Sequence, residues 1–238
     1  MTKEKTQVKE VMKSESISVA CVGTPFDIGK KELEKQGYKI ISLDEAAGIR
    51  TEGFNSNDFP RPKRYASGDL INFVTEGMLY VPKKGIYITR NSPIMDFPEV
   101  ATEFHRESSD FYLRPADVNR ALEDSTLIYG NYRMAPCPFI DMRATGKKLK
   151  AQEIFKENGD KYIKFLSQKG YSKIPIGIDL HSYDKHGDNN LPPFVRPIFF
   201  RSSKDSSEID GCWRGLGHVS EDKEGDRIMG IKKLPKKK

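Results

Sequence analysis

The sequence is poor in cysteine, histidine and tryptophan, and none of its apolar runs is long. Its three cysteines, Cys21, Cys137 and Cys212, lie far apart and make no C-x-x-C pair. An odd and scattered set argues against both a disulfide scaffold and a structural zinc site. The longest apolar runs have only a few residues, whereas a membrane-spanning helix needs about 20. Residues 1–16 also lack the apolar core of a secretory signal, so we expect a soluble protein of the reducing cytoplasm.

The excess of positive charge is confined to the C-terminal end of the chain. The sequence has 40 Lys and Arg residues against 34 Asp and Glu residues, a formal net charge of +6. The six basic residues from position 227 onward have no acid among them, so the rest of the chain carries 34 charges of each sign. A protein that binds duplex nucleic acid usually clusters its Lys and Arg residues on the folded body. The charge composition therefore does not indicate a folded domain that binds duplex nucleic acid.

Alternating patterns in the first half of the chain predict strands, a helix and a hairpin. Residues 17–22 are rich in β-formers, residues 28–36 have helical spacing, and residues 38–43 are again β-rich. This order is typical of a βαβ unit with a right-handed crossover. Further along, residues 77–81 and 86–89 flank a Pro-Lys-Lys-Gly turn, which predicts a β-hairpin.

The second half of the chain is expected to hold short helices followed by strands. Proline near the first helical position and glycine after the last one mark helix ends. Helices are expected at residues 97–107, at 115–123 and, in two pieces, within 148–168, and strands at 174–180 and 195–200. Strand and helix do not alternate regularly, so we predict an α+β fold. It should combine a mixed sheet, a β-hairpin, several short helices and a flexible basic C-terminal tail.

Composition along the chain also predicts its organisation into segments. We expect one α+β domain over residues 16–232, between a flexible N-terminal segment at 1–15 and a basic tail at 233–238. The stretch 52–68 is rich in Gly, Pro, Asn and Ser and reads as a long irregular connection. A boundary between two smaller domains would fall there.

One cluster of acidic residues and histidines provides the sharpest functional hypothesis. Five such residues follow an apolar run within ten positions, and they include two of the four histidines. Imidazole and carboxylate groups are ligands of divalent transition metals. If the apolar run is a strand, a turn could bring the cluster together around an open metal site, as in a metal-assisted hydrolase. The ligands would be Asp179, His181 and His186, with Asp184 or Asp188 as general base. The alternative is a polar surface loop.

A second hypothesis is a non-enzymatic protein associated with nucleic acid. Basic residues alternate with prolines and aromatic residues at 59–65, and such a loop can follow a phosphate backbone while an aromatic ring stacks on a base. The Lys-rich tail could add a weak contact with a polyanion. The candidate contacts are Arg61, Lys63, Arg64 and Tyr65 in the loop and Lys236, Lys237 and Lys238 in the tail. A solvated loop and a solubilising tail are the alternatives.

Overall fold

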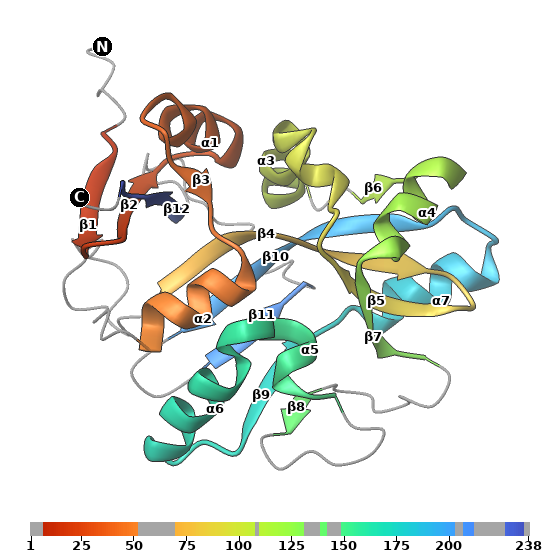
Figure 1. Cartoon of the computed structure of the whole chain (residues 1–238). Helices are drawn as coiled ribbons and strands as arrows, with labels where there is room; N and C mark the ends of the chain where they lie inside the picture. Colours follow the sequence, from red (N-terminus) through yellow and green to blue (C-terminus); the bar gives the residue numbers. More distant parts are fainter. Residues whose placement is uncertain are drawn as a thin grey trace.

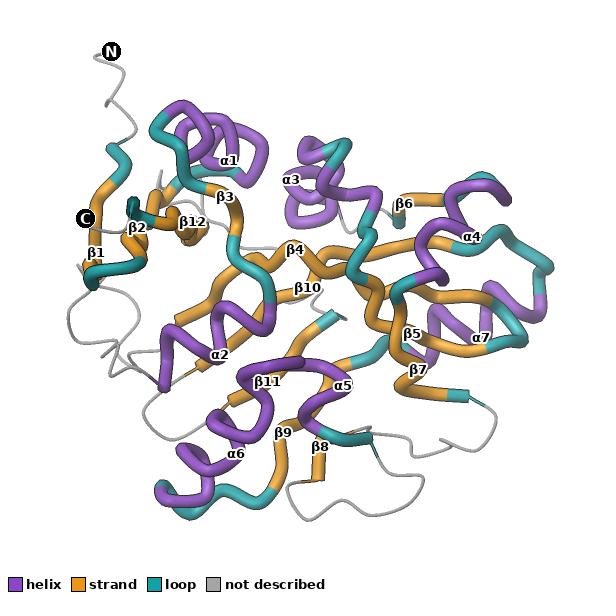
Figure 2. The backbone as a smooth tube through the Cα atoms, viewed as in Figure 1, coloured by secondary structure: helices purple, strands orange, loops and turns teal. Residues whose placement is uncertain are grey.

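A mixed β-sheet runs through the molecule, and helices pack against it (Figures 1 and 2). The computed structural model describes residues 7–51, 70–107, 110–130, 139–141, 149–202, 207–211 and 227–235. The main path of the sheet has the order β1 (Lys9–Lys13), β2 (Ile17–Gly23), β12 (Arg227–Lys233), β4 (Leu70–Val81), β10 (Phe194–Ser202), β11 (Ser207–Asp210), β9 (Lys173–Gly177) and β8 (Phe139–Asp141). Off this path, β3 (Lys39–Ile40) pairs with β12, β5 (Gly85–Thr89) pairs with β4 and β7 (Ser125–Tyr129), and β6 (Phe111–Tyr112) pairs with β10.

Short helices connect the strands and cover the sheet. They are α1 (Phe26–Lys35), α2 (Leu43–Thr51), α3 (Pro98–Glu107), α4 (Pro115–Glu123), α5 (Ala151–Phe155), α6 (Gly159–Gln168) and α7 (Leu180–Asp188), with the 3-10 helices η2 (Pro93–Met95) and η3 (Lys156–Asn158). Together with the mixed sheet they confirm the predicted α+β class. The described part of the chain contains no helix whose length and apolar character would let it cross a membrane.

Strands β4 and β10 form the centre of the sheet. They pair antiparallel, with Tyr80 opposite Phe194 and Met78 opposite Arg196. The register shifts after Pro197, where proline has no N–H to donate to the ladder. Because side chains alternate along a strand, β4 contributes to a hydrophobic core on each of its faces.

The two cores are covered by different helices. On one face, apolar side chains of α2, α5 and α6 pack against the sheet and against β9 and β11, which curve beneath its centre (Figure 1). On the other face, α1, α3 and α4 cover the sheet. This arrangement explains why the strands contain long runs of buried residues rather than a strict alternation of apolar and polar ones.

The C-terminal strand β12 is inserted between strands from the N-terminal part of the chain. It pairs antiparallel with β2 along its whole length and parallel with β4, and it also pairs with β3. The predicted strand, helix, strand unit is therefore present as β2, α1 and β3, with the last strand of the chain between its two strands. The segment 1–15, expected to be flexible, contains β1, which pairs with β2.

Most of the predicted elements are present, and two stretches differ. The hairpin and the helices at 98–107, 115–123 and 151–168 are confirmed, the last as α5, η3 and α6. The strand predicted at 174–180 ends at Gly177, and the expected loop after it is the helix α7. The predicted strand at 38–43 has only two paired residues and gives way to α2. The connection at 52–68 and the last three lysines of the tail lie outside the described residues.

Candidate functional site

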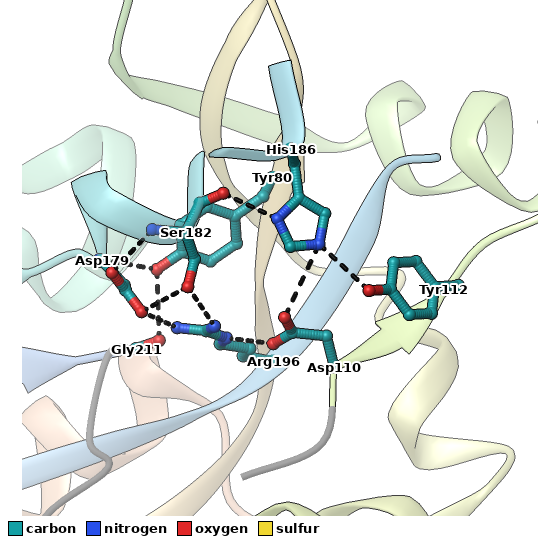
Figure 3. A network of polar contacts seen from close by, with 8 residues as sticks. All are labelled: Tyr80, Asp110, Tyr112, Asp179, Ser182, His186, Arg196 and Gly211. Carbon is teal, nitrogen blue, oxygen red and sulfur yellow. Dashed lines mark hydrogen bonds and ion pairs between the residues drawn. The ribbon is translucent and has the colours of Figure 1, made fainter. Parts of the chain in front are cut away.

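A polar network lies where β4, β6, β10 and α7 meet (Figure 3). At its centre is Arg196, whose side chain is 0% exposed and which lies among apolar residues in the first part of strand β10. A charge buried this deeply is stable only when it is paired and hydrogen-bonded. We call this set the Arg196 network: Tyr80, Asp110, Tyr112, Asp179, Ser182, His186, Arg196 and Gly211.

Two carboxylates and a hydroxyl bind the guanidinium of Arg196. Its Nε donates to Asp110 Oδ1 at 2.6 Å. Its Nη1 and Nη2 donate to Asp179 Oδ2 at 2.9 Å and to Ser182 Oγ at 3.1 Å. Burial opposes the positive charge, but the hydrogen bonds to both carboxylates and the negative charge of Asp110 raise the pKa of Arg196 above its usual range. Arg196 therefore joins the segment before β6 to the start of α7.

Asp179 is the residue that begins α7. Its Oδ1 accepts from Ser182 N at 3.0 Å and its Oδ2 from Ser182 Oγ at 2.7 Å. An aspartate in this position satisfies backbone N–H groups that the first helical turn leaves without partners. Burial opposes ionisation of Asp179, but the hydrogen bonds from Ser182 and Arg196 outweigh it and lower its pKa to about 2.

Tyr80 and Phe194 provide an aromatic wall beside Arg196. Their rings stack with centroids 4.5 Å apart, and the guanidinium carbon lies 5.2 Å from each centroid. The Tyr80 hydroxyl accepts from Asp179 N at 3.0 Å and donates to Gly211 O at 3.3 Å. The rings exclude water from the charged cluster and add cation–π contacts to it.

His186 is held in one tautomer by the helix that carries it. Its Nδ1 lies 2.7 Å from the carbonyl oxygen of Ser182, one turn earlier on α7. A carbonyl oxygen can only accept, so Nδ1 carries the proton and Nε2 of the neutral ring is an acceptor. Nε2 faces the Tyr112 hydroxyl at 3.2 Å and Asp110 Oδ2 at 3.7 Å (Figure 3). When the ring is neutral, the Tyr112 O–H therefore donates to His186 Nε2.

The network is buried around His186 and Asp110 and reaches the solvent at Tyr112. The side chains of His186 and Asp110 are 6% and 11% exposed. Tyr112, on the short strand β6, is 48% exposed. The Tyr112 ring is thus the part of the network that a molecule from solution can reach.

The predicted metal site is wrong, and the helix explains why. In the described ranges no group of three or more His, Cys, Asp or Glu side chains is placed to hold a metal ion. Residues five apart on an α-helix point about 140° away from each other, and accordingly His181 is exposed while His186 is buried. Asp184 and Asp188 are exposed on α7, and Asp179 is engaged with Ser182 and Arg196. The described residues therefore do not support a metal-assisted hydrolase.

The residues of the nucleic-acid hypothesis lie elsewhere in the chain. Arg61, Lys63, Arg64 and Tyr65 belong to the stretch 52–69, and Lys236, Lys237 and Lys238 end the chain; both stretches are outside the described residues.

Some members of the network carry a signal in the sequence, and others carry none. Asp179 and His186 belong to the acidic and histidine cluster, but the structure gives them a role other than metal binding. Arg196 carries a usable signal, because it is a single charge inside the run Phe-Val-Arg-Pro-Ile-Phe-Phe, and a charge buried in a strand needs partners. Asp110 and Tyr112 carry none, since they come close to His186 only through the pairing of β6 with β10.

Chemically, the arrangement is a base held next to a phenol. His186 has one ring nitrogen fixed by a carbonyl and the other directed at Tyr112. A reactive group, a base beside it and a third group that orients the base are the parts of an acid–base site. No protein-family model matches the chain, and neither a curated protein nor a solved structure matches it. The function therefore has to be inferred from this geometry.

Proposed function

We propose that this protein is an acid–base enzyme in which Tyr112 exchanges a proton with the substrate and His186 is its base. The observation that carries the proposal is the position of His186: Nδ1 is 2.7 Å from Ser182 O, and Nε2 is 3.2 Å from Tyr112 Oη. The ring is thus already in the tautomer that accepts a proton from the phenol. We infer that the sheet from β1 to β12 and the helices on it form one domain, and that this domain works in the cytosol.

The rest of the network supports this transfer electrostatically. When His186 takes the Tyr112 proton it becomes an imidazolium, and Asp110 Oδ2 lies 3.7 Å from the protonated nitrogen. Arg196 holds the other oxygen of Asp110 at 2.6 Å. Asp110 therefore lies where it stabilises the new positive charge without having to move.

The exposed phenol indicates the kind of group on which the enzyme acts. A phenol hydroxyl can exchange a proton with the oxygen atoms of alcohols and enols. We therefore propose a small polar substrate with a hydroxyl group or an enolisable carbonyl. It would bind against the exposed face of Tyr112, with the imidazole of His186 behind the phenol.

The role of His186 is tested by the reactivity of the Tyr112 hydroxyl. N-acetylimidazole acetylates tyrosine oxygens, and mass spectrometry can follow each tyrosine separately. We expect acetylation of Tyr112 at pH 7.5 to be about tenfold slower in His186→Gln than in the wild type, because the base has been removed. Acetylation of Tyr87, which is partly exposed on β5, is the internal control and should not change. Equal rates at Tyr112 in both proteins would contradict the role of the base.

Catalysis itself is tested by turnover of a panel of enolisable ketones and activated esters. We expect the wild type to accelerate at least one of them, and Tyr112→Phe to lose about 100-fold or more of that rate. Tyr87→Phe is the matched control, because it removes a phenol hydroxyl that has no hydrogen bond to any described residue. It should keep the wild-type rate. No turnover by the wild type, or equal turnover by Tyr112→Phe, would overturn the proposal.

A further inference from the structure

The N-terminus of α2 is attached to the sheet by a buried carboxyl group. Ser42 and Glu45 form a reciprocal cap, with Ser42 N donating to Glu45 Oε2 at 3.0 Å and Glu45 N to Ser42 Oγ at 3.1 Å. The next free N–H of the helix, that of Leu43, donates to Glu76 Oε2 of β4 at 2.9 Å. Glu76 thus satisfies an N–H group that the helix cannot satisfy by itself.

Glu76 lies in an apolar environment. It is 5% exposed and projects from the same face of β4 as Val74 and Met78, which belong to the core beneath α2. A buried carboxylate is costly unless a cation lies beside it. None of the Lys and Arg side chains that the structure describes lies within ion-pair distance of Glu76.

The charged groups around Glu76 are engaged with other partners. On α2, Asp44 accepts from the backbone of Asn158, Glu45 is paired with a lysine of β3, and Arg50 donates to a tyrosine of α6. Arg90, at the end of β5, is paired with an aspartate after α4. Burial raises the pKa of Glu76 to about 7. The hydrogen bonds from Leu43 N, from the backbone of Glu76 itself and from the Thr75 hydroxyl, together with the more distant charge of Arg90, offset this only in part.

We propose that Glu76 makes the docking of α2 on the sheet sensitive to pH around neutrality. When it is neutral, the carboxyl group accepts the Leu43 N–H at little cost. When it ionises, a charge that no described Lys or Arg side chain neutralises is buried under the first turn of α2, and water can reach it only if that turn moves away. The device is independent of the Arg196 network and of the enzyme activity proposed for it.

The sign of the effect follows from the two protonation states. In the unfolded chain the carboxyl has its ordinary pKa of 4.5, and in the folded protein its pKa is about 7. The stabilising contribution of the neutral group is therefore complete below pH 4.5 and is lost as the pH rises through 7. The attachment of α2 should weaken between slightly acidic and slightly basic solution.

Hydrogen exchange of the wild-type protein tests the proposal directly. Amide exchange is measured at pH 5.5 and at pH 8.5 and corrected for the intrinsic effect of pH on exchange. We expect the protection of residues 46–50 in α2 to fall about tenfold or more relative to that of β10. Equal changes in α2 and β10 would overturn the proposal, because they would indicate a global effect only.

The variant Glu76→Gln assigns the effect to this residue. Glutamine can still accept the Leu43 N–H but cannot ionise, so the relative protection of α2 should be the same at both pH values. Glu99→Gln is the matched control, since Glu99 is an exposed glutamate in the first turn of α3, and it should retain the pH dependence of the wild type. A Glu76→Gln protein that also retains it would contradict the proposal.

A titration of the wild type covers the case in which Glu76→Gln does not fold. The carboxyl carbons of the glutamates are followed by NMR in ¹³C-labelled protein while the pH is raised. One glutamate should titrate near pH 7, together with the amide signal of Leu43. Titration of every glutamate below pH 5.5 would overturn the proposal.

Discussion

Arg196 shows how one residue can determine the local arrangement of several segments. Its guanidinium binds Asp110, Asp179 and Ser182, which come from the segment before β6 and from the start of α7. The guanidinium lies beside the rings of Tyr80 and Phe194, a surrounding in which a charge depends on its partners. Removal of Arg196 should therefore lower the free energy of unfolding, because two buried carboxylates would lose their cation.

Replacement of Arg196 by an apolar residue of similar length tests this dependence. We expect Arg196→Met to lower the free energy of unfolding by about 3–5 kcal/mol, because it removes one partner from a buried ion-pair cluster. Urea denaturation followed by circular dichroism measures the change. The control is Arg114→Met, whose side chain is 83% exposed in its pair with Asp117; this variant should stay within about 0.5 kcal/mol of the wild type. A similar loss in both variants would argue against a buried cluster.

Among the elements, α7 has specific capping interactions at both of its ends. Asp179 caps its first turn, and its last turn closes with Leu191 N donating to His186 O at 2.9 Å and Asn190 N to Gly187 O at 3.4 Å. Asn190 has a φ of 51°, the left-handed conformation that this type of helix end requires. The Asn190 side chain also accepts from Lys83 Nζ of the β4–β5 turn at 2.6 Å. The hairpin thereby holds the end of the helix that carries His186.

Substitutions at Asn190 separate backbone conformation from side-chain contact. A β-branched residue is strained at positive φ, so we expect Asn190→Val to reduce the free energy of unfolding by about 1–2 kcal/mol. Asn190→Gly loses the contact with Lys83 but fits the conformation, and it should cost less than about 0.5 kcal/mol. Both values come from urea denaturation. Equal losses would mean that the contact, and not the backbone, determines the stability of this end.

At the scale of the whole molecule, the sheet is completed by the last described strand. β12 pairs with β2 along seven residues and with β4 on its other side. Just beyond it, Leu234 N donates to Ser16 O at 2.8 Å. Without β12, both neighbours would expose strand edges and buried residues such as Val19 and Val22 would face water.

Two truncations test this completion. Deletion of residues 227–238 removes β12, and we expect a chain without a cooperative thermal transition. Deletion of residues 236–238 alone should leave the melting temperature unchanged, since lysines at a chain end contribute little to stability. Calorimetry measures both. A cooperative transition in the longer truncation would show that β2 and β4 do not need β12.

Local signals in the sequence were sufficient to predict many of the helices and strands. The helix α4 was predicted with the bounds that it has, because a proline opens it. The hairpin of β4 and β5 was predicted from its turn, whose φ values are positive at Lys83 and Gly85. The strand predicted through residue 180 failed, because Asp179 is a helix cap that follows the short apolar run of β9.

The sequence alone determined the α+β class and most element positions, since the hydrophobic pattern and the turn residues act over a few neighbours. Only the tertiary structure decided which polar residues meet. Tyr112 reaches His186, 74 positions away, because β6 pairs with β10. Leu43 reaches Glu76 because α2 packs against β4. The energies of such contacts depend on burial and on distances between segments remote in sequence, and no local pattern of residue types records either.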